Sequence, residues 1–298
     1  MINIIGRRKI FITLSSALVA ASIVSMAVFG LKQGIDFVGG TLWHVEFQKE
    51  VTSADLSPFL KEVTGSNEIV ITKEAGANSF LIRLPEITEE QHQSYLGEIK
   101  KKYNDIEELR FESIGPVVGN ELRQNSLWAF FLVLAAISLY IAFVFRKVSF
   151  PVRSWKYGVI TLVTLFHDAI IPIGITAVYG YYQNVEVGVG LVVAVLVIIG
   201  FSVHDTIVVL DRTRENLRMA GGMVSDFAGV VNKSVNQTLA RSINTSLTLV
   251  IVSAALYWFG PESLSYFNLM ILIGVIIGTY SSICVASSLL VVWQKDRG

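Results

Sequence analysis

An aspartate enclosed by apolar residues is the side chain of this sequence best suited to chemistry. Asp205 follows the run LVVAVLVIIG at 191–200, and the segment behind it, 207–210, is apolar again. A charged side chain inside a bilayer costs roughly 2.5–3.5 kcal/mol on insertion scales, so an acid kept there predicts a function. The alternative is an acid close enough to the end of its helix to reach water. We favour the functional interpretation.

A polar stripe further along the chain predicts a basic partner for Asp205. Arg241 is followed at i+3, i+4 and i+7 by Asn244, Thr245 and Thr248, which places all four on one helical face. A carboxylate beside an arginine stays ionised, whereas the same group in an apolar setting without the cation binds a proton. The pair therefore predicts a two-state proton switch. In the alternative, Arg241 only extends toward lipid phosphates.

A second intramembrane acid occurs in TLVTLFHDAIIPIG at 161–174. Asp168 shares a helical face with the two threonines of this segment, and Pro172 loosens the same helix. Two roles for Asp168 stay open: it extends the proton path from Asp205, or it pairs structurally with a neighbouring helix. His167 by itself predicts a hydrogen bond between helices and not a titrating group.

Small residues recur every four positions in the last apolar segment, at Gly274, Gly278, Ser282 and Ala286. A stripe of this kind lets two membrane helices approach each other closely. It predicts helix packing and no chemistry.

Other features limit the range of functions. The formal net charge is zero, which leaves no basic excess for binding nucleic acid. The single cysteine, Cys284, lies in an apolar run and allows no internal disulfide. The motifs G-x-x-x-x-G-K-[ST], H-E-x-x-H and C-x-x-C do not occur, so we expect no nucleotide hydrolysis, no metal site and no cofactor.

Membrane-spanning helices must position these residues. The chain of 298 residues is 52% hydrophobic and only 16% charged, which is too apolar for a soluble domain. A bilayer core about 30 Å thick needs roughly 20 apolar residues in a helix. Six segments meet that requirement, at about 10–30, 126–145, 157–179, 187–210, 243–260 and 266–293. We therefore predict an α-helical polytopic membrane protein with six transmembrane helices and one polar insert.

The charges of the short loops predict the orientation in the membrane. Lys and Arg precede the first span, lie between the second and third, follow the fourth and end the chain, whereas 181–187 and 259–265 contain neither. The positive-inside rule places both termini in the cytoplasm and the insert 31–125 outside. The first apolar run is longer than a signal-peptide core of about 7–15 residues, so we expect an uncleaved anchor.

The insert is predicted to be a small acidic α+β domain. It has ten Lys and Arg against sixteen Asp and Glu, a net charge of −6. Ser53 is the expected N-cap of its first helix, and Thr88 with Gln91 forms a capping box at its second. Strands are expected at 41–47, 67–74, 78–85 and 106–114, helices at 53–64 and 88–103, and a turn at 75–77.

This order, β-α-β-β-α-β, is the ferredoxin-like arrangement. The predicted domains are 1–30 for the cytoplasmic N-terminus and first transmembrane helix, 31–125 for the external ferredoxin-like domain, and 126–298 for the remaining helices and the cytoplasmic C-terminus.

Four blocks of the sequence resemble a known family: GIDFVGG (34–40), ESIGPVVGNEL (112–122), FSVHDTIVVLDRTREN (201–216) and SVNQTLARSINTSLT (234–248). They are similar to the SecF subunit of the bacterial protein-export machinery, which belongs to the RND superfamily of proton-driven membrane proteins. The first block is shared with the sister subunit SecD, whereas DRTREN and ARSINTS indicate SecF. The resemblance covers nearly the whole chain.

The resemblance implies a function with partners in the bacterial inner membrane. SecF-like proteins pair with SecD, associate with the SecYEG channel and use the proton gradient to draw unfolded polypeptides out on the external side. Asp205 matches the intramembrane acid of the family and Arg241 its basic partner. The first block matches the motif where span one meets the external domain, which we interpret as a hinge that includes Gly34, Asp36, Gly39 and Gly40.

We therefore predict a proton-gradient-coupled accessory subunit of the Sec translocase and not an enzyme. Its expected partners are a SecD-like subunit, SecYEG, the translocating polypeptide and membrane lipid, without nucleic acid. Three alternatives stay open: an RND-type exporter of small molecules or lipids, an intramembrane aspartyl protease that uses Asp168 and Asp205, and a passive scaffold. Sodium ions in place of protons also remain an open choice for the coupling ion.

Overall fold

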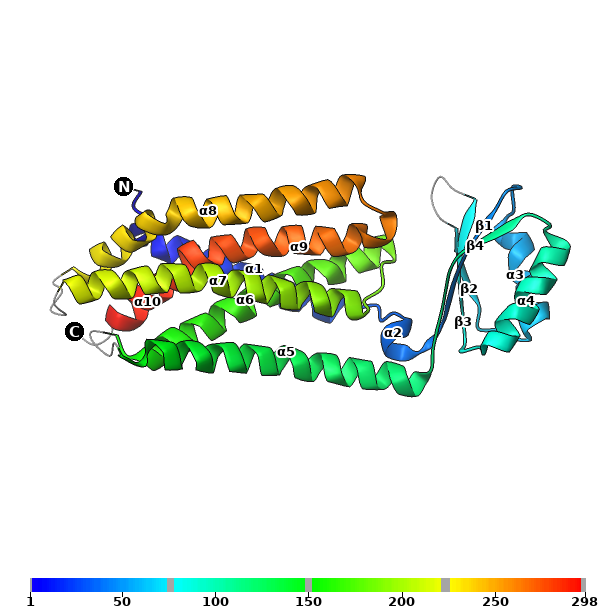
Figure 1. Cartoon of the computed structure of the whole chain (residues 1–298), viewed down its shortest axis with the longest axis horizontal. Coiled ribbons are helices and arrows are strands. Elements are labelled where there is room, and N and C mark those ends of the chain that lie inside the picture. The colour runs from blue at the N-terminus through cyan, green and yellow to red at the C-terminus, as the bar shows by residue number, and fades with distance from the viewer. Residues whose placement is uncertain (1, 74–77, 148–151, 221–225, 296–298) are drawn as a thin grey trace. The chain divides into compact units, whose positions relative to one another are not determined.

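The computed structural model describes residues 2–73, 78–147, 152–220 and 226–295. The chain forms two compact units, one of Met1–Lys32 with Trp128–Gly298 and the other of Gln33–Leu127. The first unit is a bundle of long helices, and the second contains the sheet (Figure 1).

Six helical segments of the described residues are long and apolar enough to cross a membrane, which confirms the predicted number. The last of them changes from α-helix to π-helix and back. The helices of these segments are α1 (Arg8–Phe29), α5 (Pro116–Val144), α6 (Ser154–Gln183), α7 (Val189–Met219), α8 (Phe227–Phe259), and α9 (Glu262–Tyr280), η3 (Ser281–Ala286) and α10 (Ser287–Lys295) in the last. Two short 3-10 helices are η1 (Ile5–Arg7) and η2 (Phe145–Lys147).

Several helices are longer than the apolar segments that predicted them. α5 begins ten residues before 126, α7 continues past 210 to Met219, and α8 begins well before 243. Hydropathy detects only the part of a helix that matches the bilayer, while backbone hydrogen bonding continues into polar turns. Pro116 suits the first position of α5, and the Asp226 side chain caps α8 by accepting a hydrogen bond from the Gly229 amide at 2.8 Å.

α7 packs against α6, α8 and α9. Near its C-terminal end, polar side chains join it to α8. Asn216 Nδ2 donates to Ser234 Oγ at 2.7 Å and to Gln237 Oε1 at 2.8 Å, and Arg212 Nε donates to Gln237 Oε1 at 2.7 Å. These bonds fix the two helices to each other beyond the apolar segment.

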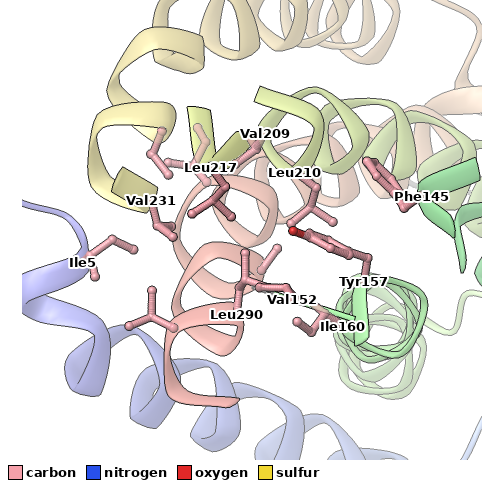
Figure 2. Packing of buried hydrophobic residues seen from close by; sticks show 14 of the residues in the cluster. Ile5, Phe145, Val152, Tyr157, Ile160, Val209, Leu210, Leu217, Val231 and Leu290 are labelled. Atoms are coloured by element: carbon pink, nitrogen blue, oxygen red, sulfur yellow. The ribbon is translucent and has the colours of Figure 1, made fainter. Parts of the chain in front are cut away.

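A hydrophobic cluster closes the end of the bundle where the chain begins. Asn232 of α8 accepts hydrogen bonds from the amides of Ile4 at 2.9 Å and Ile5 at 3.2 Å, which places Ile5 in this cluster. Figure 2 shows side chains from η1, α6, α7, α8 and α10 converging here, among them Ile5, Tyr157, Leu210, Leu217, Val231 and Leu290.

α1 packs against α6 through small residues. Gly174 of α6 has no room for a larger side chain because Ser22 of α1 lies directly against it. Ser25 Oγ donates to the Gly174 carbonyl at 2.8 Å, and Ser15 Oγ lies 3.1 Å from the hydroxyl of Tyr280. Small residues therefore hold α1 close to α6 and α9.

The second unit is a four-stranded antiparallel sheet with the order β2-β3-β1-β4. Alternate β1 side chains, including Trp43 and Val45, are fully buried, because both long helices cover one face of the sheet (Figure 1). Its elements are α2 (Ile35–Val38), β1 (Gly40–Phe47), α3 (Ser53–Thr64), β2 (Val70–Lys73), β3 (Ser79–Leu84), α4 (Glu89–Lys102) and β4 (Ile106–Ile114).

Of the two helix caps predicted for this unit, the one at α4 is confirmed and the one at α3 is wrong. The capping box of Thr88 and Gln91 is confirmed. At α3 the N-cap is Thr52 and not Ser53, because Thr52 keeps an extended backbone and its side chain accepts the Asp55 amide, while Ser53 is already helical. The turn expected at 75–77 lies outside the described residues.

Candidate functional site

Asp205 is buried within the bundle, at the contact of α7 with α8. Only 1% of its surface is exposed. Its carboxyl oxygens meet two hydroxyls of α8: Thr245 Oγ1 lies 3.4 Å from Oδ1, and Ser246 Oγ lies 3.3 Å from Oδ2. His204 Nδ1 is 4.0 Å from Oδ1, but its own side chain is largely exposed.

The two hydroxyls have nearer partners in the backbone of α8. Thr245 Oγ1 is 3.0 Å from the carbonyl oxygens of Arg241 and Ser242, and Ser246 Oγ is 2.7 Å from the carbonyl of Ser242. Ser246 Oγ also accepts a hydrogen bond from Thr279 Oγ1 at 2.6 Å, which connects the site to α9. Thus three helices meet around one carboxyl group.

This geometry permits two hydrogen-bonding states at Asp205. A serine or threonine hydroxyl has one proton to donate and two lone pairs to accept with. When the protons of Thr245 and Ser246 point to the backbone carbonyls, their lone pairs face Asp205 and can accept from a protonated carboxyl. When the same protons turn toward Asp205, they stabilise the ionised carboxylate. The site can therefore hold either form by rotating hydroxyl groups.

Arg241 does not form an ion pair with Asp205 here. Its side chain lies on an exposed face of α8, and among the described residues no ion pair of 4.0 Å or less joins it to the carboxylate. Arg241 lies one helical turn before Thr245, which does contact Asp205. Thr248 is exposed, and its hydroxyl donates to the Thr245 carbonyl at 2.7 Å. Of the predicted polar stripe, only Thr245 touches Asp205.

Ser246 and Thr279 are members of the site that the sequence interpretation missed. Ser246 lies one position beyond the exposed stripe, on the buried face of α8 that also carries Ser242 and Ser253. Serines at spacings of four and seven on an apolar helix were the available signal. Thr279 had no such signal, because only packing brings α9 next to Ser246.

Asp168 is completely buried and has a different environment. His167 Nδ1 lies 2.8 Å from its Oδ1, while Ser202 Oγ of α7 and Ser281 Oγ of η3 both donate to its Oδ2, the latter at 2.6 Å. Asp168 thus contacts neighbouring helices, as one of its two expected roles requires. No described side chain hydrogen-bonds both Asp168 and Asp205.

The small residues of the last span lie against α7. A side chain at Gly274 would overlap Ile198, and a Cβ at Gly278 would lie 3.0 Å from the Ser202 Cβ. One turn further, Ser282 Oγ lies 2.9 Å from Thr206 Oγ1. The stripe thus allows close approach to α7 next to both acids.

The glycine motif lies in the second unit, where α2 packs against the start of α5. Gly39 has φ +79° and Gly40 has φ +119°, conformations that favour glycine. A Cβ at Gly39 would lie 2.7 Å from Pro116 Cα. Gly34 and Ile35 are buried and Asp36 is half-buried in the first turn of α2. The motif is therefore closely packed against the helix that leads into the second span.

The described residues contain no cluster of three or more His, Cys, Asp or Glu side chains that could hold a metal ion.

The sequence matches two families of known proteins. Residues 95–296, which contain Asp168, Asp205 and Arg241, match the family described as "Protein export membrane protein SecD/SecF, C-terminal". Residues 24–51, which contain Gly39 and Gly40, match the "SecD/SecF GG Motif".

Several known proteins are similar in sequence to this chain over nearly its whole length. The protein translocase subunit SecF of Thermobaculum terrenum is 42% identical over 307 residues, which cover 99% of this chain and 95% of that protein. The SecF subunit of Anaerolinea thermophila is 35% identical, with coverages of 100% and 96%. The crystal structure of SecDF, a translocon-associated membrane protein from Thermus thermophilus, has a TM-score of 0.81 at 33% identity, over 99% of this chain and 39% of the SecDF chain.

Proposed function

The chain belongs to the SecD/SecF family of protein export membrane proteins, and on that basis we propose that it is a proton-gradient-coupled accessory subunit of the Sec translocase. It promotes late steps in the export of unfolded polypeptides across the bacterial inner membrane. The observation that carries the coupling is Asp205, a buried carboxyl group that meets hydroxyls able to serve either of its protonation states.

The proposed partner within the membrane is a SecD-like subunit. The chain spans 39% of the SecDF chain of Thermus thermophilus, and we assign the remaining part of such an assembly to a separate SecD-like chain. The assembly acts at a SecYEG channel, where the translocating polypeptide is the substrate. The exposed apolar faces of α1, α5 and α8 provide surface for lipid and for this partner.

We propose that both termini are cytoplasmic and that 31–125 is an external ferredoxin-like domain between the membrane parts 1–30 and 126–298. The loop distribution of Lys and Arg supports this orientation. The element order β-α-β-β-α-β and the antiparallel strand order β2-β3-β1-β4 support the ferredoxin-like assignment.

The proposed mechanism alternates two states of Asp205. In the protonated state the carboxyl group donates to the hydroxyls of Thr245 or Ser246, as the present geometry allows. In the ionised state the hydroxyls donate to it, and a shift of α8 along α7 brings Arg241 to the carboxylate as its counter-ion. Thr248, two turns beyond Arg241 on the same stripe, and Asp168 belong to the polar path that accompanies this shift.

A proton gradient supplies the energy for this alternation. Moving one unit charge across the membrane potential contributes about 2.3 kcal/mol per 100 mV, which is enough to bias a two-state helix arrangement. α1 and α5 carry the change to the external domain through the motif of Gly34, Asp36, Gly39 and Gly40, which we propose as a hinge. The domain then grips or releases the emerging chain.

Export of a stalled secretory precursor into vesicles tests this function. The vesicles contain the translocase, the SecD-like partner and either the native chain or Asp205→Asn, and the imposed gradient is of protons or of sodium ions. We expect a proton gradient to stimulate export by the native chain and not by the variant, because asparagine cannot take up the proton. Equal export by both chains would contradict the mechanism.

A matched control distinguishes the loss of Asp205 from the loss of any other carboxylate in α7. Asp211→Asn removes a carboxylate from the same helix, but this side chain is about half exposed and pairs with Arg214 at 2.9 Å. We expect this variant to export like the native chain. If a sodium gradient alone stimulated export, sodium and not the proton would be the coupling ion.

A further inference from the structure

A cavity of about 400 Å³ lies in the helical unit where α1 and α6 end. Phe29, Gly30 and Lys32 line it from the side of α1, and Tyr181 and Asn184 line it from the side of α6. Its volume falls within the range of small-ligand sites, about 300–1,000 Å³. In the orientation proposed above, these ends of the two helices lie at the outer surface of the membrane.

Two opposite charges meet at this cavity. Lys32 Nζ lies 3.7 Å from Glu186 Oε1 and 3.4 Å from Asn184 Oδ1. The backbone holds Lys32 in place, because the Val187 amide donates to its carbonyl at 2.7 Å. The side chains of Lys32 and Glu186 stay 47% and 23% exposed. An ammonium group has three protons to donate and a carboxylate has about four lone-pair sites, so each can bind a further group.

The C-terminal ends of two helices add negative potential to the cavity. α1 ends at Phe29 and α6 ends at Gln183, and residues at both ends line the cavity. The last carbonyl groups of a helix have no intrahelical partner and carry partial negative charge. The sequence 181–187 contributes no Lys or Arg to offset it. The cavity therefore favours a cationic hydrogen-bond donor, and Lys32 provides for one anionic group beside it.

Aromatic and apolar side chains adjoin the charged groups. The ring centroids of Phe29 and Tyr181 are 5.0 Å apart, and those of Tyr181 and Tyr182 are 5.3 Å apart. Tyr181 is 62% exposed, and Val24 and Val28 of α1 are 60% and 68% exposed. Tyrosine is enriched at the level of lipid headgroups, and exposed valines suit hydrocarbon. A fitting occupant thus has a polar part in the cavity and an apolar part along α1.

We propose that this cavity binds the headgroup of phosphatidylethanolamine, with the phosphate at Lys32 and the primary ammonium at Glu186 and the carbonyl ends of α1 and α6. The phosphate accepts a charge-assisted hydrogen bond from Lys32, and the lipid ammonium donates to the carboxylate. The acyl chains lie along the exposed face of α1. The site goes beyond the proposed function, since it depends on the membrane placement of α1 and α6 and not on proton coupling.

This assignment distinguishes phosphatidylethanolamine from two other phospholipids. Phosphatidylglycerol carries no cation, so Glu186 and the two helix ends repel its charge. Phosphatidylcholine has a quaternary ammonium, which has no N–H to donate to a carboxylate or carbonyl. Aromatic cages bind choline through ring faces, but the rings of Tyr181 and Tyr182 meet edge to face at 90°.

Native mass spectrometry of the full chain tests the site without any export assay. The chain is freed of lipid in detergent and incubated with phosphatidylethanolamine, phosphatidylcholine or phosphatidylglycerol of identical acyl chains at equal concentrations. We expect the native chain to retain phosphatidylethanolamine roughly tenfold better than the other two, the effect of about one hydrogen bond to a charged group. Because this comparison uses the native chain alone, misfolding of a variant cannot affect it.

Variants then locate the bound lipid. Lys32→Ala removes the phosphate partner, and Glu186→Gln removes the charge that holds the ammonium. We expect each to weaken retention of phosphatidylethanolamine by roughly tenfold. Lys9→Ala, which removes an exposed cation from the first turn of α1, is the matched control and should retain the lipid like the native chain. Asp205→Asn should also retain it.

The outcomes separate this proposal from the proposed function. Equal retention of the three lipids by the native chain would overturn the site. A preference for phosphatidylglycerol or phosphatidylcholine would overturn the assignment of the headgroup. A preference for phosphatidylethanolamine that persists in both Lys32→Ala and Glu186→Gln would overturn the location. None of these results depends on whether Asp205 couples export to protons, which the vesicle assay decides.

Discussion

Each hydroxyl group has a single proton to donate, and this limit distinguishes the two buried carboxyl groups of the bundle. Asp168 lies within 2.8 Å of His167 Nδ1 and of the hydroxyls of Ser202 and Ser281. Asp205 meets its hydroxyls at 3.3 and 3.4 Å, while the same hydroxyls lie closer to backbone carbonyls. At Asp205 the hydroxyls can therefore serve either protonation state by rotating their protons.

In the second unit, the hydrogen bonds of Glu89 predict that stability depends on pH. Hydrogen bonds from Gln93 at 2.7 Å and from His92 hold the pKa of this carboxyl below its ordinary value. Because the folded pKa is the lower one, the contribution is present above the ordinary value of about 4.3 and is lost as the pH falls through the folded pKa. We expect the α4 amides to lose hydrogen-exchange protection, corrected for intrinsic rates, on acidification below about pH 4.5.

The variant Glu89→Gln should lose part of this acid dependence, whereas Glu90→Gln, at the exposed neighbouring position, should keep it. The effect is small and weakens with salt, since the Glu89 side chain is exposed. An identical acid profile in Glu89→Gln would contradict this assignment.

Elements set the distances at which these residues meet. On α9 and η3, Gly274, Gly278 and Ser282 face α7, and hydroxyls of η3 reach Asp168 and Thr206. The π-helix η3 has a wider turn than an α-helix. Within it, consecutive Ser281 and Ser282 bond to Asp168 and Thr206, on two different helices.

Gly274→Ala tests this packing. The new methyl group overlaps the side chain of Ile198, and overpacking of this kind costs about 1–3 kcal/mol. We expect a lower midpoint of thermal unfolding in detergent. In a double-mutant cycle, Ile198→Ala should cost much less in the Gly274→Ala background than in the native chain, because it makes room for the methyl group. Strictly additive effects of the two changes would show that the residues do not compete for the same space.

The whole molecule consists of two units that the chain connects twice, near residue 33 and near residue 127. The proposed proton binding lies in one unit, and the proposed contact with the exported chain lies in the other. The helices α1 and α5 lead to the two chain connections between the units. Within the second unit, the glycine motif packs against the start of α5, which makes it part of one of these connections.

Gly39→Ala should uncouple the two units. At φ +79° and ψ 173° an L-residue is strained by roughly 1–3 kcal/mol, and its Cβ would lie 2.7 Å from the Pro116 backbone. We expect proton-driven export in vesicles to be largely lost, while the variant assembles in the membrane like the native chain. Gly97→Ala, at a helical position with nothing within 4 Å, is the control and should export normally. Normal export by Gly39→Ala would contradict a coupling role for the motif.

By itself, the sequence determined six membrane helices, the β-α-β-β-α-β order of the insert and Asp205 as the acid to examine. All three follow from local properties, namely runs of apolar residues, alternation along strands and the cost of a charge inside an apolar segment. The positions of Thr88 and Gln91 were equally local, since a capping box needs only four consecutive positions.

Only the tertiary structure decided which groups meet these acids. In this structure Thr245 and Ser246 of α8 contact Asp205, while Arg241, one turn earlier on the same helix, stays a predicted counter-ion of the ionised state. The other hydroxyls come from three separate elements: Ser281 from η3, Ser202 from α7 and Thr279 from α9. The periodicity of one helix does not predict its contacts with other elements. Which hydroxyls come near the acids depends on the close approach of helices at Gly274 and Gly278 and on the wider turn of η3. These are properties of packing and not of any single segment.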